Sequence, residues 1–419
     1  MFNNTPSYIM HLDLNSCFAT VEQQANPLLR GKPIAVAAYT SPGGCILAAS
    51  IEAKKLGIKT GMRVKEGREI YPKIIVLPPD PNKYRFVNRK LVALLREYSS
   101  EVYIKSIDEM VLNFSGSPCF EKGLKNTAVE IKRRIKEEIG EWLTMSVGIA
   151  PNRFWAKLAS SLKKPDGLIE INYTNAQDKL SKIQLSDIHG IKTGNIARLN
   201  LAGIYTPSQF YNSPIPLLKR AFGGIAGYYW YLRLHGFEID NVEFSRKSYG
   251  NSYALYKKTA DINELSKILC KLVEKMGRRL RRGGYTAQGI HVSCLLSDYS
   301  YWHQGNKTEK AMYTNTELYR EALKILKRKP DKEVKILAVS CYLLEKNLYN
   351  QLGFFEDEAS KRKLSQAVDK INDRYGDFVV SSARMMGLDN KVLDRIAFGG
   401  IKELEEFIFE EQVERVEFV

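Results

Sequence analysis

The chain has 419 residues, of which 44% are hydrophobic, and 63 Lys and Arg residues against 47 Asp and Glu residues give a formal net charge of +16. This length suggests roughly two to four domains, and the charge favours a polyanionic partner, nucleic acid before an anionic membrane surface. No apolar run is long enough to span a membrane and no secretory signal is present, so we expect a cytoplasmic protein without a membrane partner. The six cysteines and five histidines lack zinc-binding spacing, which argues against structural zinc and a disulfide framework.

Strands and helices alternate over roughly the first 170 residues. The expected strands cover 8–13, 32–38, 44–50, 101–105, 109–114 and 144–150. The expected helices run from an N-cap at Asn15 or Ser16 to near Pro27, and over 51–57, 82–98, 124–139 and 152–162. This alternation predicts an α/β sheet domain.

The pattern changes twice in the rest of the chain. Residues 180–240 are typical of helices and turns. Beyond residue 245 we expect a basic helix, a strand, a polar loop, a second helix and a long strand, with the regular elements at 262–282, 289–296, 315–328 and 333–344. This order predicts a separate small α+β domain, and residues 347–419 form a tail that is helical in parts.

Three acidic residues, Asp13, Asp108 and Glu109, lie at the ends of predicted strands. If the first strand pairs beside the 102–114 hairpin, their carboxylates meet at one edge. Two ionised carboxylates about 4 Å apart repel by roughly 4 kcal/mol at an effective dielectric of about 20, so such a cluster must share a proton or bind cations. Oxygen ligands without His or Cys nearby favour Mg²⁺, and two such ions suit displacement at phosphorus. Alternatively, Asp13 is a helix N-cap and the other two are solvated turn residues.

Two lysines extend this hypothesis. Lys54 lies on the short helix after the third strand, and Lys164 lies in the loop "KKPDG". The helix that follows Asp13 also offers free backbone amides to a phosphate. Each lysine alone is compatible with a solvated charge, but beside a metal site they predict a nucleoside-triphosphate pocket.

Four motifs now support a resemblance to a known family. They are "HLDLNSCFATVE" (11–22), "GCILAASIEAKKLGIKTGM" (44–62), "SIDEMVL" (106–112) and "SVGIAPNRFWAKLASSLKKPDG" (146–167). In order and spacing they resemble the Y-family translesion DNA polymerases, closest to the bacterial UmuC-like branch, and the resemblance covers about residues 7–345.

The resemblance implies an α+β multidomain protein with the right-hand arrangement of a polymerase. The implied parts are a palm at 1–18 and 83–172, small fingers at 19–82, a helical thumb at 173–240, an α+β little finger at 245–346 and a C-terminal tail at 347–419. The implied activity is template-directed DNA synthesis across damaged template, with low fidelity and no proofreading. Its substrates would be primer–template DNA and a dNTP.

The same motifs imply roles for single residues. Asp13, Asp108 and Glu109 would hold two Mg²⁺ ions with help from the Leu14 carbonyl. Phe18 falls on the steric-gate position, although an ordinary core aromatic is the alternative. The implied nucleotide contacts are Cys17, which replaces an aromatic beside the gate, Phe18, Lys54 and Lys164. Many relatives carry Tyr and Arg where this chain has Ile51 and Lys54, and lysine grips phosphate less directionally than arginine.

Two further stretches predict DNA contacts. "HGIKTGNIARL" resembles a helix-hairpin-helix whose amides around Gly190 and Gly194 contact phosphates, although Lys192 replaces a glycine and a packing glycine is the alternative. The helix at 262–282 has an apolar stripe flanked by cations. Its expected phosphate ligands are Lys275, Arg278, Arg279 and Arg282, unless this is merely a solvated helix face.

The tail contains two interaction candidates. "QLGFF" resembles the peptide by which bacterial polymerases bind the sliding clamp, with Gln351, Leu352, Phe354 and Phe355 as anchors. The acidic end of the chain is compatible with an accessory or regulatory protein partner, with a cover over the basic DNA surface, or with a solvated helix.

Two rival functions remain open from the sequence. One is a catalytically silent DNA- and clamp-binding protein, which would lack a carboxylate, and the other is a palm-type enzyme such as a nucleotide cyclase, which needs no duplex-holding surface. Primer extension with Mg²⁺ and dNTPs separates the three.

Overall fold

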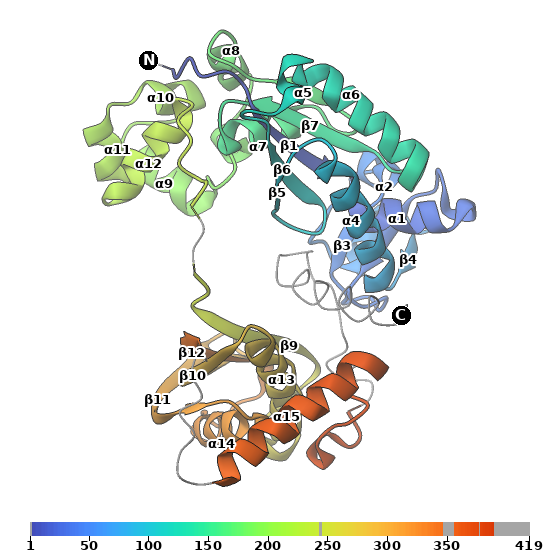
Figure 1. Ribbon diagram of the computed structural model, residues 1–419, viewed down its shortest axis with the longest axis vertical. Coiled ribbons are helices and arrows are strands. Elements are labelled where there is room, and N and C mark those ends of the chain that lie inside the picture. The colour runs from blue at the N-terminus through green and yellow to red at the C-terminus, as the bar shows by residue number, and fades with distance from the viewer. Residues whose placement is uncertain (1, 243–244, 347–355, 377, 389–419) are drawn as a thin grey trace. The chain divides into compact units, whose positions relative to one another are not determined.

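The structure is a computed structural model that describes residues 2–242, 245–346, 356–376 and 378–388 (Figure 1). The described residues fall into two compact units that divide near residue 243. Among the helices in these ranges, none combines the length and the hydropathy that a bilayer crossing demands.

The core of the first unit is a five-stranded sheet in the order β5-β6-β1-β7-β8. Its strands are β1 (Ile9–Leu14), β5 (Glu101–Ile104), β6 (Glu109–Asn113), β7 (Met145–Ala150) and β8 (Leu168–Glu170). β1 pairs antiparallel with both β6 and β7, so it lies in the middle of the sheet and is buried along almost its whole length. Because side chains alternate along a strand, β1 sends two different sets of residues to the two faces.

The two faces of this sheet are covered by different helices. Met10 and Leu12 pack in a core with α4 (Pro81–Arg96) and α6 (Leu124–Arg134), which continues into the π-helical turn η2 (Ile135–Ile139). Ile9 and Val111 pack on the opposite face with α7 (Arg153–Leu162). α7 approaches β7 so closely that a Cβ at Gly148 would lie 2.0 Å from the Ala156 carbonyl oxygen, so this strand position requires glycine.

A smaller sheet follows β1, in the order β3-β2-β4, with its own core. It contains β2 (Ile34–Ala37), β3 (Ile46–Ala49) and β4 (Ile75–Leu77), and its helical elements are α1 (Cys17–Ala25), η1 (Pro27–Leu29), α2 (Ile51–Lys55) and α3 (Val64–Ile70). Neither β4 nor α3 was predicted. The N-cap position of α1 is Ser16 as expected, but its backbone is left-handed (φ 52°), so Ser16 caps none of the described amides with its side chain.

Short helices complete the first unit. They are α5 (Pro118–Glu121), α8 (Ala176–Ser181), η3 (Leu185–Asp187), α9 (Thr193–Leu201), α10 (Pro207–Asn212), α11 (Ile215–Phe222) and α12 (Ile225–Leu234). The helical bundle from α8 onward is anchored to the N-terminus of α7. Asn152 Nδ2 donates hydrogen bonds to the carbonyls of Arg233 and Phe237, both at 3.0 Å, and Trp155 Nε1 donates to the Leu234 carbonyl at 3.1 Å.

The second unit is a four-stranded antiparallel sheet in the order β11-β10-β12-β9. Its elements are β9 (Ser248–Thr259), α13 (Ile262–Arg282), β10 (Tyr285–Leu296), β11 (Tyr301–Met312), α14 (Asn315–Leu326), β12 (Val334–Lys346), α15 (Glu356–Tyr375) and η4 (Ala383–Met385). The apolar stripe of α13 packs with α14 against one face of the sheet. The segment predicted as a polar loop contains β11, and β9 was not predicted at all. Both are edge strands, and most of their side chains are polar or exposed.

The tail helix α15 packs against α13 through arginine–aspartate pairs. Arg281 is buried and donates from Nε and Nη2 to the Asp369 carboxylate at 2.6 and 2.8 Å. Its Nη1 also donates to the Tyr313 carbonyl at 3.1 Å and to Asn315 Oδ1 at 2.8 Å. Removal of the carboxylate from a buried ion pair is destabilising, because it leaves the charge of the guanidinium uncompensated.

We therefore expect Asp369→Ala to destabilise the second unit by roughly 2–3 kcal/mol, because it leaves a buried charge without its anion. The free energy of unfolding should be measured by urea denaturation. Lys370→Ala changes an exposed neighbour on the same helix and should behave like the wild type. Equal stability of the two variants would show that α15 does not hold this position in solution.

Candidate active site

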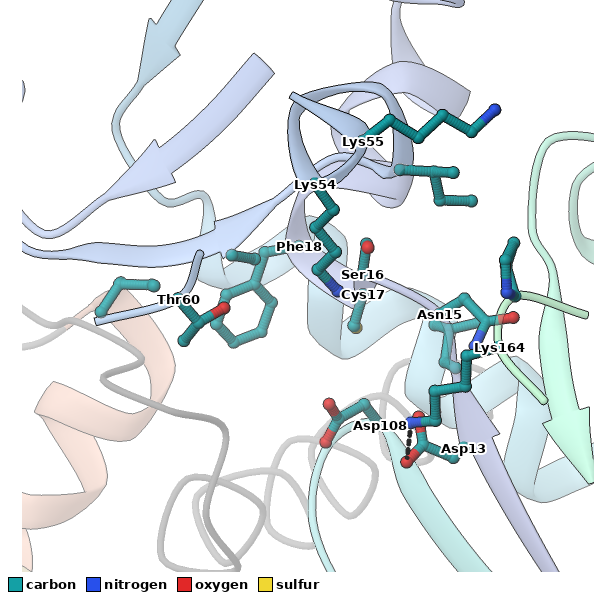
Figure 2. Close-up of a pocket in the computed structure, with 15 residues that line it drawn as sticks. Asp13, Asn15, Ser16, Cys17, Phe18, Lys54, Lys55, Thr60, Asp108 and Lys164 are labelled. Carbon is teal, nitrogen blue, oxygen red and sulfur yellow. Dashed lines mark ion pairs between the residues drawn. The ribbon is translucent and has the colours of Figure 1, made fainter. Parts of the chain in front are cut away.

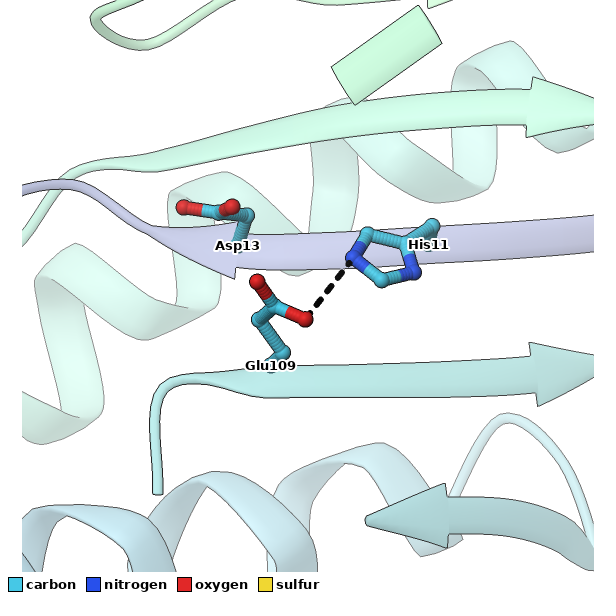
Figure 3. Close-up of side chains that lie close together, drawn as sticks. All are labelled: His11, Asp13 and Glu109. Carbon is cyan, nitrogen blue, oxygen red and sulfur yellow. Dashed lines mark ion pairs between the residues drawn. The ribbon is translucent and has the colours of Figure 1, made fainter. Parts of the chain in front are cut away.

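The antiparallel register of β1 and β6 places Asp13 opposite Glu109. Both side chains lie on the face of the sheet that α7 covers, because Asp13 lies four residues along β1 from Ile9 and Glu109 lies two residues along β6 from Val111. Figure 3 shows the two carboxylates next to the His11 ring, and one oxygen of each carboxylate and a ring nitrogen of His11 lie within 4.8 Å of one another. The prediction that acidic residues far apart in the sequence converge is confirmed.

Asp108 completes the carboxylate cluster from the turn that precedes β6. Its backbone carbonyl accepts a hydrogen bond from the Leu14 amide at 2.9 Å, and its side chain accepts one from the Ser106 hydroxyl at 2.5 Å. Burial raises the pKa of Asp108 to about 6, and the charges of Asp13 and Glu109 add to this effect despite the opposing Ser106 bond. A cation bound next to Asp108 would favour its ionised form and oppose this rise of the pKa.

Two lysines balance the charge of the other two carboxylates. Lys164 Nζ lies 2.6 Å from Asp13 Oδ2, and Lys157 Nζ lies 2.5 Å from Glu109 Oε2. Burial raises the pKa of Asp13 in spite of its lysine. Burial acts in the same direction on Glu109, but the hydrogen bond to Lys157 and the nearby positive charges together outweigh it, and the pKa of Glu109 falls. The clustered oxygens therefore fit divalent cations, which would take over the role of the two ammonium groups.

His11 was missed as a neighbour of this cluster, and the expectation that no His or Cys lies nearby is wrong. His11 Nε2 lies 3.7 Å from Glu109 Oε2. Burial lowers the pKa of His11 to about 3, so the ring is neutral at physiological pH. The two-residue spacing from Asp13 puts both side chains on one face of β1, and that spacing was the available signal.

A cavity of about 590 Å³ opens beside Asp13 and Asp108 (Figure 2). Its walls come from the end of β1, the start of α1, the helix α2 and the loop after α7. All four residues that we expected at the nucleotide line this cavity, namely Cys17, Phe18, Lys54 and Lys164, and so does Leu14, which we expected at the metal ions. The cavity therefore has two carboxylates and two ammonium groups in its lining, with Lys164 paired to Asp13, and these charges suit a polyphosphate bound through cations.

Phe18 lines this cavity although only 4% of its surface is exposed. Its ring stacks on Tyr84, with centroids 4.4 Å apart and planes inclined by 16°. Tyr84 is fixed in turn, because its hydroxyl donates to Glu22 Oε1 at 2.9 Å and accepts from the Asp80 amide at 3.1 Å. Phe18 is thus a core aromatic and a rigid wall of the cavity at once, and neighbouring Cys17 is equally buried.

The two lysines of the cavity are placed by local structure. Lys54 lies on α2, whose N-cap Ser50 accepts the Ala53 amide at 3.2 Å. Burial lowers the pKa of Lys54 and the charge of Lys164 adds to this, while the charges of Asp13 and Asp108 act in the opposite direction.

The loop that carries Lys164 is tied down by Asp166. Its carboxylate lies 3.0 Å from Lys132 Nζ and 3.2 Å from Lys136 Nζ, and its amide donates to Asn15 Oδ1 at 2.8 Å. The sequence did not predict that Asp166 holds this loop, because its partners Lys132 and Lys136 are about 30 residues away and no local pattern links them.

The expected DNA-binding glycines have different surroundings. Gly190 has φ +86°, and a Cβ there would lie 3.3 Å from the Trp230 ring, so packing alone explains this glycine. Gly194 lies in the first turn of α9, where a Cβ would meet no described atom within 4 Å. Lys192 donates to the Ser186 carbonyl at 3.0 Å and stabilises the hairpin from within. Contact of either glycine with phosphate stays a prediction.

The cations predicted to bind DNA from α13 are engaged inside the second unit. Arg278 and Arg282 both donate to Asp373 of α15, Arg279 is buried and donates to the Gly250 carbonyl at 3.2 Å, and Lys275 lies over the Phe378 ring. These contacts do not favour phosphate binding at this face, although binding itself is untested. The stretch around Gln351, Leu352, Phe354 and Phe355 and the acidic end of the chain lie outside the described residues.

The second unit has a sheet face that the sequence did not predict. It faces away from α13 and α14, and its exposed residues include Tyr301, His303 and Lys307 of β11, which alternate with half-buried ones. His303 accepts or donates a hydrogen bond with His291 of β10 at 3.2 Å. The side chains of β11 are polar on both faces of the strand, so its sequence lacks the hydrophobic alternation that would have predicted a strand.

Paired carboxylates at the end of a central strand, next to a nucleotide-sized cavity with two lysines, define a palm-type nucleotidyltransferase. Residues 12–161 match the impB/mucB/samB family, and residues 246–354 match the C-terminal domain of that family. The chain belongs to this family, which is that of the Y-family DNA polymerases.

Relatives and solved structures agree with this assignment. The chain is 31% identical over 382 residues to DNA polymerase IV of Pelotomaculum thermopropionicum, covering 90% of this chain and 94% of the relative. A Y-family DNA polymerase chimera of Dbh with a Dpo4 segment superposes with a TM-score of 0.71 at 27% identity, covering 81% of this chain and 99% of the other. DinB from Sulfolobus solfataricus superposes with a TM-score of 0.52 at 27% identity, covering 80% of this chain and 98% of the other.

The protein is a translesion DNA polymerase with the right-hand fold of its family and requires divalent metal. The expected UmuC-like branch is wrong, since the relatives named DNA polymerase IV and the DinB structure indicate the DinB-like branch. The four motifs that carried the resemblance are shared features of palm and fingers, so they could not separate the branches.

Proposed function

We propose that Asp13, Asp108 and Glu109, with the Leu14 carbonyl, hold two Mg²⁺ ions that serve the transfer of a dNMP to a primer 3′ end. The observation that carries this proposal is the register that sets Asp13 opposite Glu109, next to Asp108. When bound, the two ions lower the pKa of the primer hydroxyl and neutralise charge on the phosphates. The proposed donor set of three carboxylates and one carbonyl is all oxygen, which favours Mg²⁺, and His11 lies beside this set.

The chain's own residues then orient the nucleotide. Lys54 and Lys164 bind the triphosphate in the cavity beside Asp13, and Phe18 with Cys17 bounds the sugar. A ribose 2′-hydroxyl finds no room against the Phe18 ring, which Tyr84 holds in place. Lys54 presents a point charge where relatives carry arginine, so binding relies on charge more than on directed hydrogen bonds.

The proposed domain boundaries are those of the sequence assignment. The palm comprises 1–18 and 83–172, the fingers 19–82, the thumb 173–240 and the little finger 245–346. The contacts with DNA phosphates do not depend on the base sequence. They come from the hairpin before α9 and from the open sheet face with Lys307 and His303, more than from α13. A sliding clamp at 351–355, an accessory protein at the acidic end and a cytoplasmic location remain part of the proposal.

Primer extension tests this function. Full-length protein with Mg²⁺, dNTPs and a template that carries an abasic site should extend the primer past the lesion, and added sliding clamp should increase the length of the products. DNA binding without extension would indicate a silent DNA-binding protein, and turnover of nucleotide without primer would indicate a cyclase.

Lys164→Ala should raise KM for the incoming dNTP by roughly tenfold, because a charged hydrogen bond to phosphate contributes about 1.5–3 kcal/mol. Single-nucleotide insertion kinetics measure this effect. Lys163→Ala is the matched control, since Lys163 is the exposed neighbour in the same loop and should leave KM unchanged. Equal KM values for both variants would remove Lys164 from the triphosphate site.

A further inference from the structure

A second cavity adjoins the carboxylate cluster on the side of the thumb. It has a volume of about 480 Å³ and lies between the sheet, α7 and the loop before α9, all within the first unit. Glu109 and His11 line it from the sheet, Lys157 and Arg153 from α7, and His189 and Arg233 from the thumb. Glu109 thus borders this cavity, while Asp13 and Asp108 border the nucleotide cavity.

Lys157 has a fixed position at this border. The close approach of α7 to β7 at Gly148 brings the helix down onto the face of the sheet that carries Glu109. Lys157 Nζ lies 2.5 Å from Glu109 Oε2, and the two side chains are only 27% and 22% exposed. A partly buried pair at this distance holds the Glu109 carboxylate more firmly than a surface ion pair could.

This ion pair competes with a divalent cation for the Glu109 carboxylate. An ion that uses Glu109 with Asp13 must share or replace the interaction of Glu109 with the ammonium, and the positive charge of Lys157 repels it. We propose that Lys157 is the counter-ion of Glu109 in the metal-free polymerase and is exchanged for a divalent cation when the site is loaded. This inference rests on the proposed role of Glu109 as a cation ligand.

The exchange leaves the ammonium of Lys157 in the second cavity. Two other cations of that cavity already have carboxylate partners, since Arg153 lies 3.5 Å from Glu238 and Arg233 lies 2.5 Å from Asp240. Lys157 then becomes a cation that can receive an anionic group there, and a phosphate of the primer strand has the required chemistry. Loading of the metal and binding of the primer are coupled through this lysine, and the coupling is reciprocal.

Metal affinity without DNA tests the proposal apart from activity. Mn²⁺ binding to the full chain, followed by electron paramagnetic resonance, should be roughly tenfold tighter for Lys157→Met, because the competing charge is gone. Lys157→Arg keeps the charge and should bind Mn²⁺ like the wild type. Lys65→Met removes one exposed positive charge from α3 and controls for net charge.

Two comparisons separate the possible failures. Glu109→Gln should weaken Mn²⁺ binding, and if it does not, the proposed ligand role of Glu109 fails. If Glu109→Gln weakens binding but Lys157→Met does not tighten it, only the exchange is overturned.

A primer–template ending in a dideoxynucleotide should strengthen Mn²⁺ binding more in the wild type than in Lys157→Met. Lys157→Gln replaces the Met variant if thermal unfolding shows that the latter does not fold.

Discussion

Asp108→Ala is expected to lower the rate of primer extension at least roughly a thousand-fold while the affinity for primer–template DNA stays near the wild-type value. A thousand-fold loss corresponds to about 4 kcal/mol of transition-state stabilisation, which is the size of effect that a catalytic metal supplies. Asp108 is suited to this role because it is held by Ser106 and has no ammonium within ion-pair distance among the described residues. Burial raises the pKa of Asp108, and the charges of Asp13 and Glu109 add to this effect.

Single-turnover extension and fluorescence anisotropy with labelled DNA measure the two quantities for Asp108→Ala. Asp108→Asn keeps the shape and the Ser106 hydrogen bond but removes the charge, so it should be almost as inactive. Asp178→Ala removes an exposed carboxylate from the thumb helix α8 and should extend primers normally. Extension by Asp108→Ala at the wild-type rate would refute the assignment of this carboxylate to the metal site.

Phe18→Ala is expected to reduce discrimination between dNTPs and rNTPs by about a hundredfold, a free-energy difference of about 2.7 kcal/mol. The ring is 4% exposed, stacks on Tyr84 and borders the nucleotide cavity, so it cannot move aside for a ribose 2′-hydroxyl. Removal of the Phe18 ring opens the wall of the nucleotide cavity where we expect the ribose 2′-hydroxyl. The ratio of kcat/KM for a dNTP and the matching rNTP gives the effect directly.

Loss of core packing must be separated from loss of the gate, since truncating a buried phenylalanine costs about 3–5 kcal/mol of stability. Phe18→Leu fills more of the core and should retain more of the discrimination. Tyr84→Phe keeps the stacked ring but loses the bond to Glu22, and it should lie between Phe18→Ala and the wild type. Unchanged sugar selection in Phe18→Ala would leave Phe18 as a core aromatic only.

The convergence of Asp13 and Glu109 could be predicted because strand periodicity is local. A residue at the end of one buried strand and a residue at the start of a hairpin strand need only an antiparallel register to meet. The helix 262–282 was also placed correctly, because its apolar stripe has a strong helical period.

Other features depend on tertiary contacts that no local pattern reports. Lys157 meets Glu109 only because α7 docks on one particular face of the sheet. The sequence predicted arginines of α13 as phosphate ligands, but Asp369 and Asp373 of α15 pair with arginines of this helix in the structure. β11 was missed because an edge strand can be polar on both sides without losing its backbone pairing.

Anomalous scattering from manganese shows whether the three carboxylates hold the divalent cations of nucleotidyl transfer. Crystals of the full chain should contain Mn²⁺, a dNTP and a primer–template that ends in a dideoxynucleotide. Our account predicts two manganese peaks in contact with Asp13, Asp108 and Glu109, with the dNTP phosphates between them and Lys164. Manganese bound elsewhere, with the α-phosphate away from these carboxylates, would contradict it.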